Sequence, residues 1–422
     1  MRKRKPIEWA KLDNAAKIFP PTTNEIDTKV FRFVCELKEE VDKEILQSAL
    51  DKTLPLFPMY QTILRRGVFW YYFEQTDLKP EVVEENKLPC SMLYRQNRRN
   101  LLFEVSYFHN RINLEMYHAV TDGTGALSFL KTLIYYYLTM KHSSDFTEKL
   151  PNLDYDASFT QRMDDSYLKY YDGDKRINKV KLTKAYHITG RRSIDNRMKV
   201  IEGEMPVKQV LELAHQYNTT LTIYLTALFF MAIYQDMPAR QRKYPVVLTV
   251  PVNLRSFFPS VTARNFFAAV NIRYHFGNQS NRLEDVIASV KESFERELTE
   301  EKLRKHLNRL SALEHNAFTR VVPLVLKDYV LRFANYLSDR GITASISNVG
   351  KVTISKELAP YIQLFDCFTS VRRPQICMCS FGESLVVSFT SPFTGTDIQK
   401  NFFRMLTKEG VSIAVAANIK DI

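Results

Sequence analysis

A histidine at the end of an alternating apolar run is the residue of this chain best placed to do chemistry. Apolar side chains recur at every second position over residues 112–116, as along one face of a half-buried strand that ends at His118. From residue 126 the apolar spacing is helical, so Asp122 and Gly123 fall in a strand-to-helix turn. Partial burial and the positive helix end both disfavour an imidazolium there. We therefore predict that His118 is neutral and acts as a general base.

The same pattern also fits a structural role, because histidine occurs in cores and on surfaces and Asp-Gly is a common turn pair. Two other segments place polar residues at the ends of predicted strands. Arg255 follows the β-rich run over 244–252, and Ser347 with Asn348 follows a short strand predicted over 342–346. Together with His118, these positions are the candidates for a site.

The length of 422 residues exceeds what a single hydrophobic core usually supports and predicts two domains. Strand and helix patterns mix in both halves, which predicts an α/β fold with mixed sheets. A polar, irregular stretch lies between residues 142 and 192. We expect one domain over residues 1–165, a connecting segment over 166–195 and a second domain over 196–422.

The net charge of +12 and the isoelectric point near 9.2 favour an acidic partner: a phosphate-bearing cofactor, an acidic carrier protein or an anionic lipid surface. No nucleic-acid-binding motif is evident, and we expect no nucleic-acid partner. The five cysteines form no Cys-x-x-Cys pair, and no His or Cys spacing suits a metal, so we expect no metal site. Residues 221–234 are too short to span a bilayer and predict a buried helix. Without an apolar leader after Met1–Lys5, we expect a cytoplasmic protein.

Three motifs stand in a fixed order along the chain. They are His118 to Gly123, then Pro251 to Arg255 with the later pair Asn265-Phe266, and finally Ser347 to Gly350. Together they resemble the condensation-domain superfamily, which includes chloramphenicol acetyltransferase, condensation domains of peptide synthetases, alcohol acetyltransferases and polyketide-associated acyltransferases. The resemblance covers essentially the whole chain.

This resemblance implies two chloramphenicol acetyltransferase-like domains with an active-site tunnel between them. It implies that His118 removes a proton from an alcohol, which attacks a thioester directly without a covalent acyl-enzyme. The thioester would be acyl-CoA or a phosphopantetheine-bound acyl group on an acidic acyl carrier protein, with no bound cofactor. The acceptor would be a small-molecule or lipid alcohol.

The resemblance also assigns supporting residues. Asp122 would pair with Arg255 and hold the turn that aims His118, the alternative being a plain surface ion pair. The Gly123 amide and the side chains of Ser347 and Asn348 would contact the oxyanion or the acceptor, although Ser-Asn before a glycine is also common turn chemistry. Four aromatic residues are expected near the tunnel, with core packing as the alternative: Tyr117, Phe266, Phe267 and Phe389.

Departures from the family narrow the assignment. Peptide-forming condensation domains usually carry a histidine at the position of Tyr117, and the plant-type Asp-Phe-Gly-Trp-Gly motif is missing. The nearest match is therefore the free-standing alcohol acetyltransferase and polyketide-associated branch. The alternatives are a carrier-dependent, amide-forming condensation enzyme and a non-catalytic binding protein of the same fold. The basic residues 2–5 suggest peripheral membrane contact, the alternative being a solvated chain end.

Overall fold

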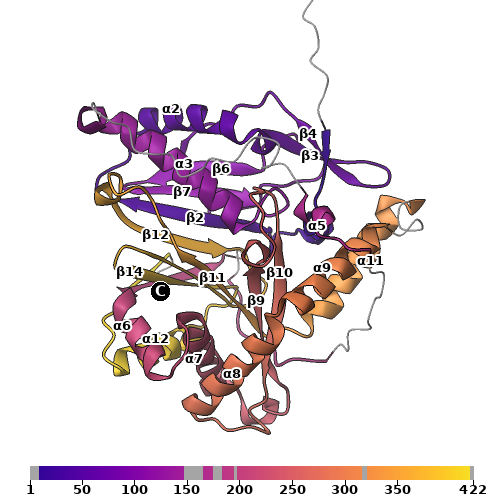
Figure 1. Ribbon diagram of the computed structural model, residues 1–422, viewed down its shortest axis with the longest axis vertical. Coiled ribbons are helices and arrows are strands. Elements are labelled where there is room, and N and C mark those ends of the chain that lie inside the picture. The colour runs from indigo at the N-terminus through magenta and orange to yellow at the C-terminus, as the bar shows by residue number, and fades with distance from the viewer. Residues whose placement is uncertain (1–8, 147–164, 174–182, 194–196, 316–320, 419–422) are drawn as a thin grey trace, which may run out of the picture.

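A computed structural model describes residues 9–146, 165–173, 183–193, 197–315 and 321–418. Two large sheets lie one above the other in the view of Figure 1, and each has helices packed on it. The upper part comes mainly from the first half of the sequence and the lower part from the second. This mixed α/β architecture confirms the predicted fold class.

The upper sheet has five strands in the order β12-β2-β7-β6-β5. Its central strand β7 buries nearly every side chain on both faces, as expected for a strand covered from two sides. Helices α2 and α3 pack together on the sheet, and the strand β7 leads directly to His118. The elements are β2 (Val30–Leu37), β5 (Val83–Glu84), β6 (Phe103–Phe108), β7 (Arg111–Tyr117), β12 (Ile362–Thr369), α2 (Lys43–Thr53) and α3 (Gly123–Lys141).

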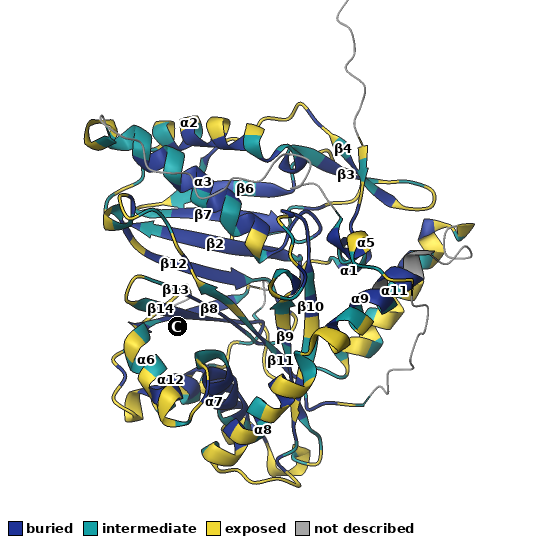
Figure 2. Cartoon of the chain, in the orientation of Figure 1, coloured by how far each residue is buried: buried dark blue, intermediate teal, exposed yellow. Residues whose placement is uncertain are grey.

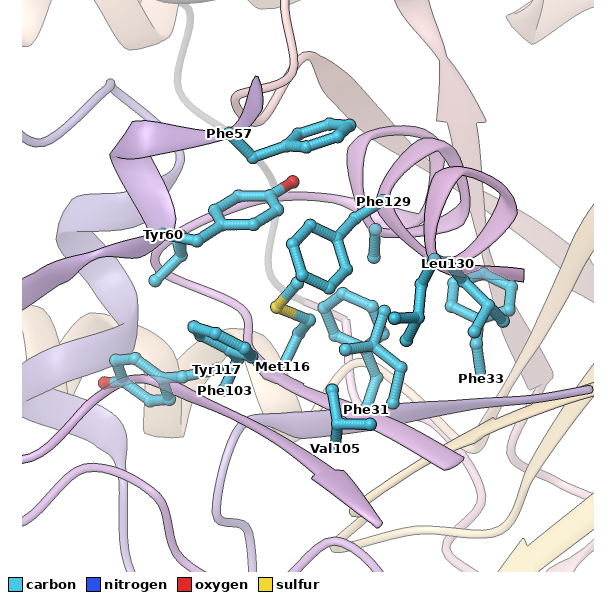
Figure 3. Close-up of a cluster of buried hydrophobic side chains, with 14 of the residues drawn as sticks. Phe31, Phe33, Phe57, Tyr60, Phe103, Val105, Met116, Tyr117, Phe129 and Leu130 are labelled. Carbon is cyan, nitrogen blue, oxygen red and sulfur yellow. The ribbon is translucent and has the colours of Figure 1, made fainter. Parts of the chain in front are cut away.

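An aromatic cluster holds α3 against this sheet. The Phe129 ring of α3 lies 5.1, 5.2 and 5.5 Å, between ring centroids, from Phe57, Tyr60 and Phe103 (Figure 3). All four side chains are buried, and such ring pairs add about 0.5–1.5 kcal/mol each beyond their burial. The cluster therefore fixes the position of α3, whose first residue follows the His118 turn.

One strand of the upper sheet comes from the far end of the sequence. Strand β12 pairs antiparallel with β2, although the predicted division places residues 362–369 in the second domain. The second half of the chain thus completes the sheet of the first half. Within the predicted connecting segment, residues 174–182 and 194–195 lie outside the described residues. The predicted domain boundaries stay a prediction.

The lower sheet has seven strands in the order β10-β9-β11-β13-β14-β8-β15. Its strands are β8 (Lys199–Pro206), β9 (Val246–Asn253), β10 (Phe267–Tyr274), β11 (Ala344–Lys351), β13 (Gln375–Phe381), β14 (Ser384–Ser391) and β15 (Ala414–Ala417). Helix α7 is buried all round, as predicted for residues 221–234, whereas α6 buries only one face. The helices of this half are α6 (Val207–Gln216), α7 (Leu221–Asp236), α8 (Leu283–Glu297), α9 (Glu300–His315), α11 (Leu324–Asp339) and α12 (Asp397–Lys408).

A small three-stranded sheet lies beside the upper one, in the order β1-β4-β3. Its strands are β1 (Trp9–Lys11), β3 (Thr62–Arg66) and β4 (Tyr71–Gln75), and a short helix α1 (Phe19–Thr22) follows β1.

All five cysteines are buried and free. In the described part of the chain, no helix has the length and apolarity to cross a membrane, and no cluster of His, Cys, Asp or Glu could hold a metal ion.

Candidate active site

His118 lies in the turn after β7 and is enclosed by aromatic rings. Its backbone N–H donates to Lys29 O at 2.8 Å, which ties the turn to the start of β2. Phe19 stacks on the imidazole at 4.7 Å, Phe31 meets it edge-on at 4.9 Å, and Phe267 lies 5.4 Å away, all between ring centroids. Burial among these rings lowers the pKa of His118 below its usual value of 6.5. The shift has the direction expected from the strand-end position.

Asn265 fixes the orientation of the imidazole. His118 Nδ1 lies 3.2 Å from Asn265 Oδ1, and Asn265 Nδ2 donates to Asp13 Oδ2 at 3.2 Å. An ionised carboxylate can only accept, which places the amide nitrogen toward Asp13 and the amide oxygen toward the histidine. The amide oxygen also only accepts, so Nδ1 carries the proton and Nε2 carries the lone pair. Among the described residues no hydrogen bond to Nε2 is found, so its lone pair is not engaged by them.

Asp13 supports Asn265 from the protein interior. Its side chain is 1% exposed, and burial raises its pKa to about 6, against the opposing effect of the Arg264 guanidinium 3.7 Å away. The N–H of Ala16 also donates to Asp13, at 2.8 Å. Above pH 6 the carboxylate is ionised and accepts from the Asn265 amide. A polar chain thus runs from Arg264 through Asp13 and Asn265 to His118.

Asp122 caps helix α3 and pairs with Arg255. Its Oδ1 accepts from the N–H groups of Thr124 and Gly125 at 3.1 and 3.2 Å. Its Oδ2 accepts from Arg255 Nη1 at 2.7 Å and from the N–H of Phe266 at 2.8 Å. The two charged side chains are only 7% and 10% exposed. The structure therefore brings Asp122 and Arg255 together as a buried pair rather than a surface one.

Arg255 connects this helix start to the loop that carries Asn265. It lies in the short helix η6 (Leu254–Ser256) after β9. Its Nη2 donates to the carbonyl oxygens of Thr262 and Arg264 at 2.9 and 2.7 Å. Both carbonyls belong to the loop before β10, and Asn265 is the next residue of that loop. One guanidinium therefore positions the two segments that orient the histidine.

The three predicted substrate contacts lie in different settings. Gly123 is the first residue of α3, so its N–H has no acceptor within the helix. Ser347 and Asn348 lie inside β11, which continues to Lys351 instead of ending at residue 346 as predicted. Asn348 Nδ2 donates to Thr222 Oγ1, and its Oδ1 accepts from the N–H of Gly350, both at 2.8 Å. Among the described residues, neither side chain is hydrogen-bonded to His118.

A β-bulge lets β11 continue beyond the end that the sequence predicts. The pairing of β11 with β13 shifts between Asn348 and Gly350, and Gly350 has a φ of +89°, which glycine adopts at little cost. The strand therefore passes through a sequence that is typical of a turn.

Only Phe267 of the four predicted tunnel aromatics packs on His118, whereas the other three are fully buried core side chains: Tyr117, Phe266 and Phe389.

Sequence reasoning missed several residues of the site. Phe19 and Phe31 pack on His118 but belong to segments without a recognisable motif. Asn265 stands in one of the three motifs, but the sequence alone does not indicate its contact with His118. Asp13 is separated from Asn265 by 252 positions, and no local pattern connects the two residues.

The family model described as alcohol acetyltransferase matches residues 106–366, which is more than half of the chain. The matched region includes the turn with His118, the Asp122–Arg255 pair and Asn265. The chain belongs to the alcohol acetyltransferase family. It is therefore an acyltransferase, as predicted from the three motifs. A comparison with curated proteins found no match.

Solved structures of other proteins show the same fold. The TRI3 trichothecene 15-O-acetyltransferase from Fusarium sporotrichioides is 11% identical with a TM-score of 0.61, and 95% of this chain and 94% of that chain are covered. Polyketide synthase associated protein 5 from Mycobacterium tuberculosis is 12% identical, with a TM-score of 0.59 and coverage of 94% and 96%. The first condensation domain of the calcium-dependent antibiotic synthetase is 14% identical, with a TM-score of 0.60 and coverage of 96% and 99%. These likenesses confirm the predicted superfamily fold.

Proposed function

We propose that this acyltransferase moves an acyl group from a thioester to the hydroxyl of an alcohol. The donor is acyl-CoA or an acyl carrier protein, and no covalent acyl-enzyme forms. The observation that carries the proposal is the setting of His118, an imidazole whose pKa is lowered by burial, whose Nδ1–H faces Asn265 Oδ1 and whose Nε2 has no hydrogen bond to a described residue. The net charge of +12 suits donors that carry phosphates or an acidic carrier.

In the proposed reaction, the alcohol O–H donates to His118 Nε2. As the alcohol oxygen attacks the thioester carbonyl carbon, Nε2 takes the proton and the carbonyl oxygen becomes an oxyanion. The intermediate then collapses, the carbon–sulfur bond breaks, and the departing thiolate takes the proton from the imidazolium. A positioned base of this kind contributes about 100- to 10,000-fold in rate.

The oxyanion needs a donor, and Gly123 is the strongest candidate. Its N–H lies at the positive end of α3, where a developing negative charge is stabilised. Ser347 and Asn348 stay candidates for contact with the acceptor. Asn265 and Asp13 act as positioning residues that keep the proton on Nδ1. The Asp122–Arg255 pair holds the turn after β7 and the loop before β10 in fixed relative positions.

An alcohol acceptor is favoured over amide formation by the residue before the base. Tyr117 is fully buried, and its hydroxyl lies 2.8 Å from Thr23 Oγ1. A core tyrosine thus occupies the position at which peptide-forming condensation domains usually carry the first histidine of the motif.

The test is thiol release from acetyl-, octanoyl- and palmitoyl-CoA with and without a panel of alcohols and amines, with products identified by mass spectrometry. We expect release that an alcohol stimulates and that falls at least about 100-fold in His118→Ala. The matched control is His215→Ala, an exposed histidine on α6, which should keep full activity. Full turnover by His118→Ala would refute the base mechanism, and stimulation by amines alone would refute the alcohol acceptor. If no CoA thioester reacts, the same comparison with acyl carrier thioesters identifies the donor.

A further inference from the structure

The outward face of α11 carries large apolar side chains that are exposed in the described part of the chain. Tyr329, Val330 and Phe333 are 64, 67 and 62% exposed. They recur at helical spacing with three other exposed residues and form one continuous stripe: Val325, Leu326 and Tyr336. Figure 2 shows this exposure along α11. The helix buries only Leu324 and Asp328, so most of its apolar surface faces outward.

The hairpin between β3 and β4 extends this stripe. Val68 at its tip is 71% exposed and Trp70 is 47% exposed. The N–H of Leu324 donates to Val68 O, and Lys327 Nζ donates to Phe69 O, both at 2.8 Å. These bonds place the tip against the start of α11. We call the exposed apolar residues of α11 and of the tip, Val68 to Trp70, the α11 surface.

Both acidic side chains of α11 are paired with arginines. Asp328, the acid in the first half of α11, is 3% exposed and accepts from Arg66 Nη2 at 3.1 Å and from the Tyr71 hydroxyl at 2.9 Å. The other acid of the helix, Asp339 at its end, is paired with Arg373. Arg332 is exposed beside the stripe. The α11 surface is thus apolar and aromatic, with the exposed Arg332 beside it.

We propose that the α11 surface docks on an anionic lipid bilayer. An amphipathic helix with aromatic residues on its apolar face and arginine or lysine beside it is suited to lie at the boundary of headgroups and acyl chains. Long basic side chains can then reach the lipid phosphates. A symmetric contact with a second copy of the chain is less suited, because it would place Arg332 of both copies in one interface while both acids of α11 are already paired.

The surface lies close to the candidate base. Helix α1 packs against α11, where Arg332 Nε donates to Pro21 O at 2.7 Å. Phe19, the first residue of α1, stacks on His118. If the proposed reaction takes place at His118, docking would favour a substrate whose aliphatic chain is held in the bilayer. This statement about the substrate is the only part of the inference that rests on the proposed function. The docking itself does not depend on that reaction.

The experiment is flotation of the purified full chain with vesicles of phosphatidylcholine, with or without phosphatidylglycerol. We expect flotation with the anionic vesicles, weakened by high salt. The double variant Val330→Ser/Phe333→Ser should bind at least about tenfold more weakly, and Val68→Ser should weaken binding independently. The matched control is Phe108→Ser, which removes an aromatic side chain that is 48% exposed in the hairpin before β7. We expect the variants to keep the melting temperature of the wild type and its rate of acyl transfer to a soluble alcohol. These two measurements distinguish a loss of docking from a loss of folding or of activity.

Three outcomes would overturn the proposal. The first is wild-type protein that does not float with anionic vesicles, and the second is equal flotation of wild type and both apolar-to-serine variants. The third is a wild-type dimer that the double variant converts to a monomer without any effect of vesicles, which would assign the surface to a second copy of the chain. None of these outcomes bears on the acyl transfer, because lipid binding is measured without turnover.

Discussion

His118 Nδ1 and Asn265 Oδ1 lie 3.2 Å apart, although 147 positions separate the two residues in the sequence. The contact joins the turn after β7 to the loop before β10, so the ring orientation of the base depends on both large sheets. A displacement of either segment would change the direction of the Nε2 lone pair. In the proposed mechanism, this hydrogen bond therefore links the action of His118 to the relative position of the two halves.

Replacing Asn265 tests this coupling. We expect Asn265→Ala to lower kcat about 10- to 100-fold with little change in KM, because the ring loses its fixed orientation while substrate contacts remain. The Asn265 hydrogen bond also raises the pKa of His118, so its loss should move the acid limb of kcat/KM to lower pH. Asn271→Ala, an exposed position on β10, serves as the control. An unchanged kcat and pH profile would exclude a positioning role.

The proposed role of the buried His118 as the base predicts how the activity of the wild-type enzyme depends on pH. Only neutral His118 accepts a proton, and burial lowers its pKa below 6.5. We therefore expect kcat/KM to rise with pH through a midpoint below 6.5 and to be level near pH 7. The measurement is initial rate against pH at low substrate concentration. A midpoint above 6.5 would contradict the predicted environment.

Asp13 predicts a pH-dependent stability difference. Its pKa is about 6 in the folded chain and near 3.8 when unfolded, so folding favours its protonated form. Its contribution to stability is full below pH 3.8 and is lost as the pH rises to 6. Relative to wild type, Asp13→Asn should become more stable as the pH rises from 4 to 6, in thermal melts. Asp77→Asn, at an exposed position, should show no such trend.

Asp122 is expected to matter for stability as well as for activity. Asp122→Ala leaves Arg255 buried without its partner, which typically costs about 3–5 kcal/mol, and removes a helix cap worth about 1 kcal/mol. Urea unfolding measures the loss. Glu74→Ala breaks the more exposed pair with Arg65 and should cost under about 1 kcal/mol. Equal losses in the two variants would show that the Asp122 pair has no special structural role.

Two glycines of the same turn should respond differently to alanine. A Cβ at Gly125 would lie 2.2 Å from both Ala263 O and Thr121 Oγ1, so Gly125→Ala must push α3 away from the loop before Asn265. We expect a loss of about 1–3 kcal/mol in unfolding free energy and a reduced kcat. A Cβ at Gly123 would meet only the Phe33 ring, at 3.7 Å, so Gly123→Ala should fold normally. Comparable melting temperatures for both variants would contradict this difference.

The segment around His118 could be predicted because its signals are local. Alternation along β7 and helical spacing in α3 fix the turn between them, and the charge of Asp122 at the helix start agrees with its observed capping role. The partner Arg255 followed from the resemblance, since spacing alone does not pair residues 133 positions apart.

The rest of the site depends on contacts that leave no local trace. Asp13 contacts Asn265, and Phe19 contacts His118, only because the folded chain brings distant segments together. Neither periodicity nor turn chemistry therefore identifies these two residues. Ser347 and Asn348 looked like the end of a strand, because the β-bulge at Gly350 lets β11 run through residues that favour turns. The amino-acid composition likewise gives no indication that β12 pairs with β2.

The position of β12 sets an order of events during protein synthesis. Strand β2, which contributes Phe31 to the surroundings of His118, cannot gain its outer neighbour until residue 369 has been made. Until then the growing chain presents an unpaired edge of largely apolar residues, which other chains could join. Chaperone protection of nascent chains and the yield of active enzyme should therefore depend on how quickly the ribosome reaches this late strand.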